Sequence, residues 1–254
     1  MKVLLAGGAG MVGTFITPYL KEHHELRVLD LAQPQHDGVE FVQGSVTDPE
    51  AIAKAIDGVD AFIWLVMLSP QGGSVTDQDL KVIRENYDVN CLGLHTFLWL
   101  AQGAGLTRGV YTSSMSVHYR GRDYYRSEEE IPLDTPSAYG LSKGFGEVIC
   151  RYFASWFDMN IIALRITGPR KREDYIEERQ RPIGDRPDGS KPLFVTDEAD
   201  LARAYLAALE TVQVGHGRFD PVFIAGDEDE KEHNLSKARR LLGWTPQSHL
   251  ELEV

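Results

Sequence analysis

Cysteine is scarce in this chain, and so are long basic stretches. Its 254 residues include only two cysteines, Cys91 and Cys150, both in apolar, helix-like contexts. We interpret them as reduced core residues, because disulfide frameworks and metal sites use several cysteines at regular spacing. The formal net charge is -12, and no basic run is longer than Arg170-Lys171-Arg172. A nucleic-acid partner is not expected, because phosphate binding requires a basic surface.

The chain also lacks a long apolar run. No stretch approaches the roughly 18 residues of a membrane-spanning helix. The first apolar stretch is interrupted by glycine after about four residues, which is too short for the core of a signal peptide. We therefore expect a cytoplasmic protein without a membrane partner. Its composition, 43% hydrophobic and 25% charged, and its length predict one α/β domain over 1–254, with a small lobe drawn mainly from 168–254.

Glycine, by contrast, is concentrated near the start of the chain. The apolar run Val3 to Ala6 is typical of a strand buried on both faces of a parallel sheet, and a helix can begin at Thr14. The glycines between them fit G-x-x-G-x-x-G or G-x-G-x-x-G, beginning at Gly7 or Gly8 and continuing with Gly10 and Gly13. Such glycines allow a tight turn, close approach of a pyrophosphate and close helix–strand packing. The segment therefore predicts a dinucleotide site.

An acidic residue stands where such a site needs one. Leu26 to Asp30 reads as a second strand, and Asp30 lies 20 residues beyond Gly10. A carboxylate there bonds the adenosine ribose hydroxyls and would repel a 2′-phosphate. No Arg or Lys follows directly, so the sequence favours NAD over NADP.

Strand-like and helix-like segments alternate along the chain, which predicts a doubly wound parallel sheet of the Rossmann type. The expected strands cover 3–6, 26–30, 39–42, 60–68, 110–114, 160–166 and 219–225. The expected helices cover 14–21, a segment from 49, 80–104, 138–157, 198–211 and 235–242. The charged segment 170–192 shows no clear period and is expected to form a mobile, loop-like cover over the site.

The chemistry is predicted at Tyr139-Gly140-Leu141-Ser142-Lys143. Residues four apart on a helix share a face, so Tyr139 and Lys143 would point into the same space. An ammonium group near a phenol favours the phenolate, whose parent pKa is about 10. Tyr139 could then transfer a proton. Ser114, at the end of the fifth strand, could donate a hydrogen bond to a substrate oxygen.

Together these motifs resemble the extended short-chain dehydrogenase/reductase family, in its NAD-dependent epimerase/dehydratase group. The matching residues are the glycines, Asp30, Asn90, Ser113-Ser114-Met115-Ser116-Val117, Tyr139-x-x-Ser142-Lys143 with Glu147, and Leu164-Arg165 before Gly168-Pro169. The resemblance covers nearly the whole chain. It implies Ser114 as hydroxyl donor, Tyr139 as acid/base and Lys143 as the group that holds the cofactor ribose. It also implies NAD contacts from Gly7, Gly10, Met11, Val12, Gly13, Asp30, Ser45, Val46, Leu65, Val66, Asn90, Tyr139, Lys143 and Ile166.

The chain departs from the family pattern at three points. Ser45 stands where many relatives carry an acid for the adenine amino group. The fourth strand runs into Trp64-Leu65-Val66-Met67 where relatives usually have His-Leu-Ala-Ala, which predicts a bulkier wall near the cofactor. Only 25 residues separate Pro169 from Val195, which leaves little chain to grip a nucleotide sugar.

Among compact members the chain is similar to uronate dehydrogenases. That similarity places Ser69 and Met115 at substrate-contact positions and leaves Arg172, on the charged segment, as a candidate for the substrate-binding arginine of those enzymes. His118 is a further candidate substrate contact because it closely follows Ser114. We therefore expect an NAD-dependent oxidoreductase acting on a sugar or sugar acid, without a metal. Two alternatives stay open: a nucleotide-sugar epimerase or dehydratase that recycles its NAD, and a non-catalytic NAD-binding sensor. Extended relatives often pair through two helices, so a homodimer is expected, with Phe97 and Trp99 either in the core or on the dimer face.

Overall fold

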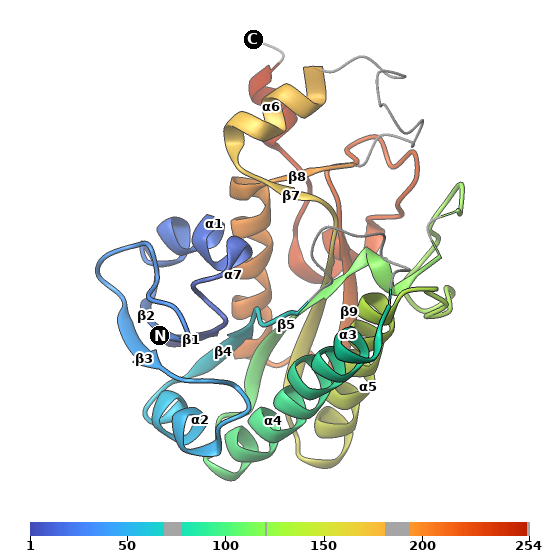
Figure 1. Cartoon of the computed structure of the whole chain (residues 1–254). Helices are drawn as coiled ribbons and strands as arrows, with labels where there is room; N and C mark the ends of the chain where they lie inside the picture. The colour runs from blue at the N-terminus through green and yellow to red at the C-terminus, as the bar shows by residue number, and fades with distance from the viewer. Residues whose placement is uncertain (69–77, 120, 181–193, 253–254) are drawn as a thin grey trace.

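The computed structural model of the protein describes residues 1–68, 78–119, 121–180 and 194–252. Its centre is a sheet of seven parallel strands in the order β3-β2-β1-β4-β5-β6-β9 (Figure 1). The strands are β1 (Lys2–Ala6), β2 (Glu25–Asp30), β3 (Glu40–Gln43), β4 (Ala61–Trp64), β5 (Arg108–Ser114), β6 (Asn160–Ile166) and β9 (Phe219–Ile224). The predicted doubly wound parallel sheet is confirmed.

Helices cover both faces of this sheet. One face carries α1 (Met11–Leu20) and α7 (Glu198–Val214), and the other carries α2 (Pro49–Ile56), α4 (Leu94–Gly103) and α5 (Ala138–Trp156) (Figure 1). Val3 and Leu5 of β1 are buried with the first pair of helices, whereas Leu4 and Ala6 are buried with the second group. Because both faces are covered, the strand reads as a continuous apolar run.

Helix starts follow local capping signals. Asp48 accepts a hydrogen bond from the backbone N–H of Glu50 at 3.0 Å, and α2 begins at Pro49. Ser137 accepts one from the N–H of Gly140 at 3.0 Å, which fixes the first turn of α5. Neither cysteine forms a disulfide; Cys150 is a core residue, as expected, whereas Cys91 is only half-buried. Within the described part of the chain, no helix is both long enough and apolar enough to cross a bilayer.

The strand expected over 60–68 is shorter in the structure. β4 stops at Trp64, which pairs with Ala6 of β1 and with Tyr111 of β5. β1 ends at Ala6, where the glycine turn begins. The apolar residues 65–68 therefore leave the sheet, although their hydrophobicity resembles that of a strand.

The helix expected over 80–104 is not one regular helix. It consists of α3 (Leu80–Glu85), the π-helical segment η1 (Asn86–Gly93) and α4. Within η1 the Asn90 side chain donates to the Asn86 side chain at 3.0 Å and to Ser142 of α5 at 3.0 Å. Inserted wide turns of this kind are frequent at functional sites.

The expectation of a loop-like cover is wrong for 172–180, which form α6 (Arg172–Gln180). Before it, β7 (Pro169–Arg170) pairs with β8 (Thr196–Asp197). Tyr175 is buried, with the guanidinium groups of Arg172 and Arg179 lying 5.7 and 5.9 Å from its ring centre. Arg179 also pairs with Glu228. These contacts hold α6, and residues 181–193 of the predicted cover lie outside the described residues.

Candidate active site

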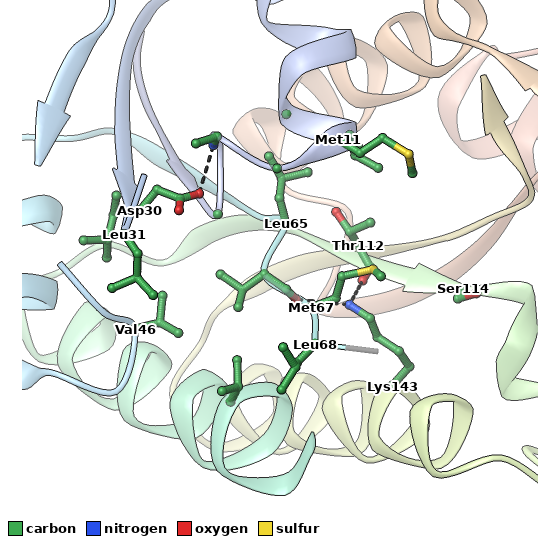
Figure 2. Close-up of a pocket in the computed structure, with 18 of the residues that line it drawn as sticks. Met11, Asp30, Leu31, Val46, Leu65, Met67, Leu68, Thr112, Ser114 and Lys143 are labelled. Atoms are coloured by element: carbon green, nitrogen blue, oxygen red, sulfur yellow. Dashed lines mark hydrogen bonds between the residues drawn. The ribbon is translucent and has the colours of Figure 1, made fainter. Parts of the chain in front are cut away.

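A cavity of about 660 Å³ opens at the carboxyl edge of the sheet (Figure 2). Its wall is formed by the glycine turn, the segments after β2, β3 and β4, the ends of β5 and β6, and the first turns of α5. Ligands of open α/β sheets bind at this edge, because the parallel strands all deliver their following loops there. The wall is mostly apolar, with a few polar groups, as expected for a small-molecule site.

The glycine turn leaves room for a dinucleotide phosphate. Gly7 has φ +83°, and a Cβ on it would lie 2.8 Å from the backbone nitrogen of Val66. A Cβ on Gly13 would lie 2.2 Å from the carbonyl oxygen of Gly8. Side chains are therefore excluded where the turn meets the cavity wall and where α1 packs against the turn. α1 begins at Met11, and the N–H groups of its first turn have no partner within the helix.

Asp30 ends β2 and lines the same cavity. Its carboxylate accepts the N–H of Ala9 at 2.9 Å, drawn as a dashed line in Figure 2, and the N–H of Ala32 at 3.2 Å. These bonds fix the acid where ribose hydroxyls can donate to its remaining lone pairs. Among the described residues that line the cavity, Lys143 is the only basic one, so no cation stands beside Asp30 to receive a 2′-phosphate. The donor set fits NAD.

The segment after β3 forms the end of the cavity near Asp30. Ser45 lines it, and its hydroxyl oxygen lies 2.7 Å from that of Thr47 and accepts the Thr47 N–H at 3.1 Å. Val46 beside it is buried, and Leu31 covers the same region (Figure 2). This end therefore offers apolar faces and one hydroxyl to an adenine ring.

Tyr139 and Lys143 lie one turn apart on α5 and both line the cavity. The Lys143 amine donates to the carbonyl of Thr112 at 2.8 Å and to that of Val66 at 3.3 Å. Its burial disfavours the charged form and lowers the pKa of Lys143 to about 7. The Tyr139 hydroxyl donates to the Met67 thioether at 3.5 Å.

Ser114 stands where β5 ends, on the same cavity. Its oxygen accepts the N–H of Ser116 at 3.0 Å and caps the short helix η2 (Met115–Val117). This bond uses a lone pair of the oxygen, so the hydroxyl hydrogen can still donate to a ligand. The structure thus brings Ser114, Tyr139 and Lys143 to one cavity with the glycine turn and Asp30. Their chemical roles stay predictions.

Asn90 supports the cavity wall from behind. Its side-chain oxygen accepts the N–H of Leu68 at 2.8 Å, and its nitrogen donates to the Leu68 carbonyl at 3.0 Å. Met11, Val12, Leu65, Val66 and Ile166, by comparison, line the cavity itself, as do the predicted glycines.

The predicted substrate contacts are not brought together in the described part of the chain. Ser69 lies outside it. Met115 packs against the hydrophobic core beside the α7 face, and Arg172 bonds Asp197 and the Ser248 carbonyl, both at 3.2 Å. His118 is fully buried. None of these three is among the residues that line the cavity.

His118 belongs instead to a buried network behind the site. Its Nε2 accepts from Arg165 at 3.1 Å, so its Nδ1 donates to the Pro132 carbonyl at 2.8 Å. Burial, together with the positive charge of Arg165, lowers the pKa of His118 to about 4, so the ring is neutral. Arg165 makes two bonds to Glu147, at 2.8 and 2.7 Å, and Glu147 also accepts the Ser113 hydroxyl at 2.6 Å. The network ties α5 to the ends of β5 and β6.

Some lining residues carried no sequence signal. Thr112 contributes through its backbone carbonyl, which no side-chain pattern reveals. The contact between Met67 and Tyr139 also went unforeseen, although the bulky end of the fourth strand pointed to an altered wall.

The parallel sheet, the glycine turn and the cavity at the carboxyl edge define a protein with a Rossmann-type dinucleotide-binding fold. Comparison with known proteins agrees: the model of the NAD dependent epimerase/dehydratase family matches residues 3–179, and the chain belongs to this family. NAD is therefore confirmed as the cofactor of the family, and the predicted family is confirmed.

Individual relatives differ in substrate. A 3 beta-hydroxysteroid dehydrogenase/Delta 5-->4-isomerase of Mycobacterium tuberculosis is 37% identical over 137 residues, but that match covers only 52% of this chain and 36% of that enzyme. An NAD-dependent glucose-6-phosphate dehydrogenase of Haloferax volcanii is 27% identical over 270 residues, covering 97% of this chain and 93% of that enzyme. The solved structure of a mutated uronate dehydrogenase is similar with a TM-score of 0.77 and 25% identity, covering 99% of this chain and 84% of that one.

Proposed function

We propose that the protein is an NAD-dependent dehydrogenase that oxidises a carbinol carbon of a sugar or sugar acid, or reduces the corresponding carbonyl. One observation carries the proposal: a hydroxyl, a phenol and an amine, from Ser114, Tyr139 and Lys143, line the same cavity as the glycine turn and Asp30. A non-catalytic NAD sensor would have no need of the phenol and amine on one helical turn. The similarity to sugar-specific dehydrogenases over nearly the whole chain supports a sugar-type substrate.

The side chains supply the proton chemistry of such a reaction. NAD, when bound, supplies the hydride acceptor. Ser114 donates a hydrogen bond to the substrate oxygen, and Tyr139 takes the hydroxyl proton during oxidation. Lys143, when protonated, favours the ionised phenol and can also bond the cofactor ribose. Because burial holds the pKa of Lys143 near 7, its charge responds to pH in the physiological range.

The test is a turnover screen with purified protein. D-glucose 6-phosphate, D-glucose, D-galactose, D-glucuronate, D-galacturonate and UDP-glucose are each incubated with NAD while NADH absorbance is followed. We expect NADH to accumulate with a free sugar, sugar phosphate or uronate. Conversion of UDP-glucose without net NADH would instead indicate an epimerase. Tyr139→Phe should lower turnover by about 100-fold or more while NAD binding, measured by calorimetry, persists. A Tyr139→Phe variant of undiminished activity would remove this residue from the mechanism.

We also propose that two copies of the chain pair through α4 and α5. These helices lie side by side on one face of the sheet (Figure 1). Together with the adjoining η1, these two helices expose several large apolar side chains: Leu92, Trp99, Phe145, Tyr152 and Trp156. Large apolar side chains gathered on adjoining exposed helices are typical of a protein interface.

A further inference from the structure

Met67 lines the cavity where Tyr139 meets it. It follows β4 by three residues and is 45% exposed. Its sulfur lies 3.5 Å from the Tyr139 hydroxyl. Met67 lines the same cavity as Lys143, and both residues are labelled in Figure 2. Met67 therefore occupies space that a substrate approaching Tyr139 must enter.

The backbone around Met67 is held on both sides. The Val66 carbonyl accepts from the Lys143 amine at 3.3 Å, and Leu68 makes two bonds with the Asn90 side chain, at 2.8 and 3.0 Å. The backbone position is thus tied to η1 and α5. The Met67 side chain is unbranched and flexible. Its sulfur can therefore move away from the Tyr139 hydroxyl when a substrate oxygen binds there, while the side chain stays in contact with the substrate.

The thioether of Met67 limits which substrate groups can bind next to it. A substrate oxygen must come within about 2.6–3.2 Å of the Tyr139 phenol for proton transfer. A group attached to the reacting carbon must then pass close to the Met67 sulfur, which lies 3.5 Å from the same phenol oxygen. A thioether is only a weak acceptor and has no donor. A substrate hydroxyl pressed against it would lose hydrogen bonds to water and gain no equivalent.

We propose that Met67 is a specificity-determining residue that selects substrates with C–H rather than C–OH on the carbon adjacent to the reacting one. For a sugar oxidised at its anomeric carbon, this means 2-deoxy sugars over their parent sugars. The inference rests on the proposed dehydrogenase function and names the substrate class within it.

The first experiment compares matched sugar pairs with NAD: D-glucose 6-phosphate, D-glucose and D-galactose, each against its 2-deoxy form. We expect wild-type kcat/KM to favour the deoxy member by about tenfold. Met67→Leu keeps an apolar side chain of similar size and should keep this ratio. Met67→Gln has similar length but supplies a donor and an acceptor, so the ratio should fall toward one. Met67→Ala, which removes the thioether and leaves room for water, should also reduce it.

Each outcome has a distinct meaning. Turnover of the parent sugars as fast as the deoxy sugars, or a ratio unchanged in Met67→Gln, overturns the inference and leaves the dehydrogenase proposal standing. No turnover of any sugar, together with no NAD binding, overturns both.

A second measurement does not depend on turnover. The protein has five methionines, so their ¹³C-labelled methyl groups can be resolved by NMR, with Met67 assigned from its missing signal in Met67→Leu. Added 2-deoxy-D-glucose 6-phosphate, in the presence of NADH, should shift the Met67 signal more than D-glucose 6-phosphate does. An unmoved Met67 signal with a bound deoxy sugar would overturn the proposed contact.

Discussion

Asp30 is the residue that we propose selects NAD over NADP. Its carboxylate lies on the cavity wall, held by the N–H groups of Ala9 and Ala32. Asp30→Ala removes the acceptor for the ribose hydroxyls, and losing a hydrogen bond to a charged group costs roughly 1.5–3 kcal/mol. We expect the NAD dissociation constant to rise at least about tenfold. NADP should weaken less, because the repulsion of its 2′-phosphate disappears.

Calorimetric titration with both cofactors measures this difference. Asp60→Ala is the matched control, because Asp60 accepts the N–H of Lys2 at 2.8 Å at the start of β1 and does not line the cavity. Equal weakening of NAD and NADP in Asp30→Ala, or tighter NADP binding by the wild type, would contradict the assignment of NAD.

At the residue scale, the residues predicted from spacing all line the cavity, and their roles stay predictions. The glycines and Asp30 are fixed by the geometry of a turn between strand and helix, and Tyr139 and Lys143 by the helical repeat. Residues such as His118 were placed by nearness in sequence to Ser114. In the structure the His118 ring points into the buried network and accepts a hydrogen bond from Arg165. A charged guanidinium in the interior requires such acceptors.

At the element scale, a buried ion pair links α5 to the sheet. Glu147 and Arg165 are 2% and 3% exposed at their side chains and form two hydrogen bonds. Glu147→Gln leaves the guanidinium without its counter-charge in the interior. Breaking such a pair from one side typically destabilises by about 3–5 kcal/mol. We expect a loss of this size in the free energy of unfolding from urea titration.

A solvent-facing pair provides the control for that prediction. Arg122 and Asp134 also form a bidentate pair, but their side chains are 24% and 37% exposed. Asp134→Asn should cost at most about 1 kcal/mol, because water and salt screen exposed charges. If Glu147→Gln cost no more than Asp134→Asn, the buried pair would not be what anchors α5.

The elements themselves were largely predictable, but their interruptions were not. Local periodicity indicates a helix over 80–104, whereas the widened turns of η1 come with the bonds from Asn90 to Leu68 and Ser142, partners that the pattern does not contain. Likewise, β4 stops where its neighbour β1 turns away, although residues 65–68 remain apolar. α6 escaped prediction because its single buried residue, Tyr175, gives no amphipathic repeat.

At the scale of the whole molecule, the alternation of strands and helices predicted a parallel sheet but not the position of each strand. β9 lies next to β6 at the edge of the sheet, more than 50 residues later in the chain. Right-handed crossovers restrict such placements without specifying them. The carboxyl edge, and hence the place of the cavity, follows from the parallel arrangement alone.

The buried amine of Lys143 should make global stability depend on pH. Its pKa is lowered to about 7 in the folded protein, whereas an exposed lysine in the unfolded chain titrates near 10.4. Between these values the unfolded chain binds more protons. The free energy of unfolding should therefore rise with pH through this window, by up to about 1.4 kcal/mol per pH unit from this group. Below pH 7 both states are protonated and the contribution levels off.

Urea titrations of the ligand-free protein at intervals from pH 6 to 10 measure this dependence. Lys143→Met has no titrating amine at this position, so the stability of the wild type relative to the variant should increase as pH rises. A difference that stays flat, or falls with pH, would contradict a buried amine of lowered pKa.

The proposed pairing through α4 and α5 can be tested on the assembled molecule. Trp156 ends α5 and is 75% exposed, so a charge there would face the second copy across an apolar interface. We expect the wild type to be a dimer in light scattering coupled to gel filtration and Trp156→Glu to shift it toward the monomer, because an unpaired charge is costly to bury. Val214→Glu is the matched control: Val214 is 84% exposed but ends α7 on the opposite face of the sheet, so the dimer should persist. A monomeric wild type, or equal dissociation by both variants, would show that this apolar face does not join two copies.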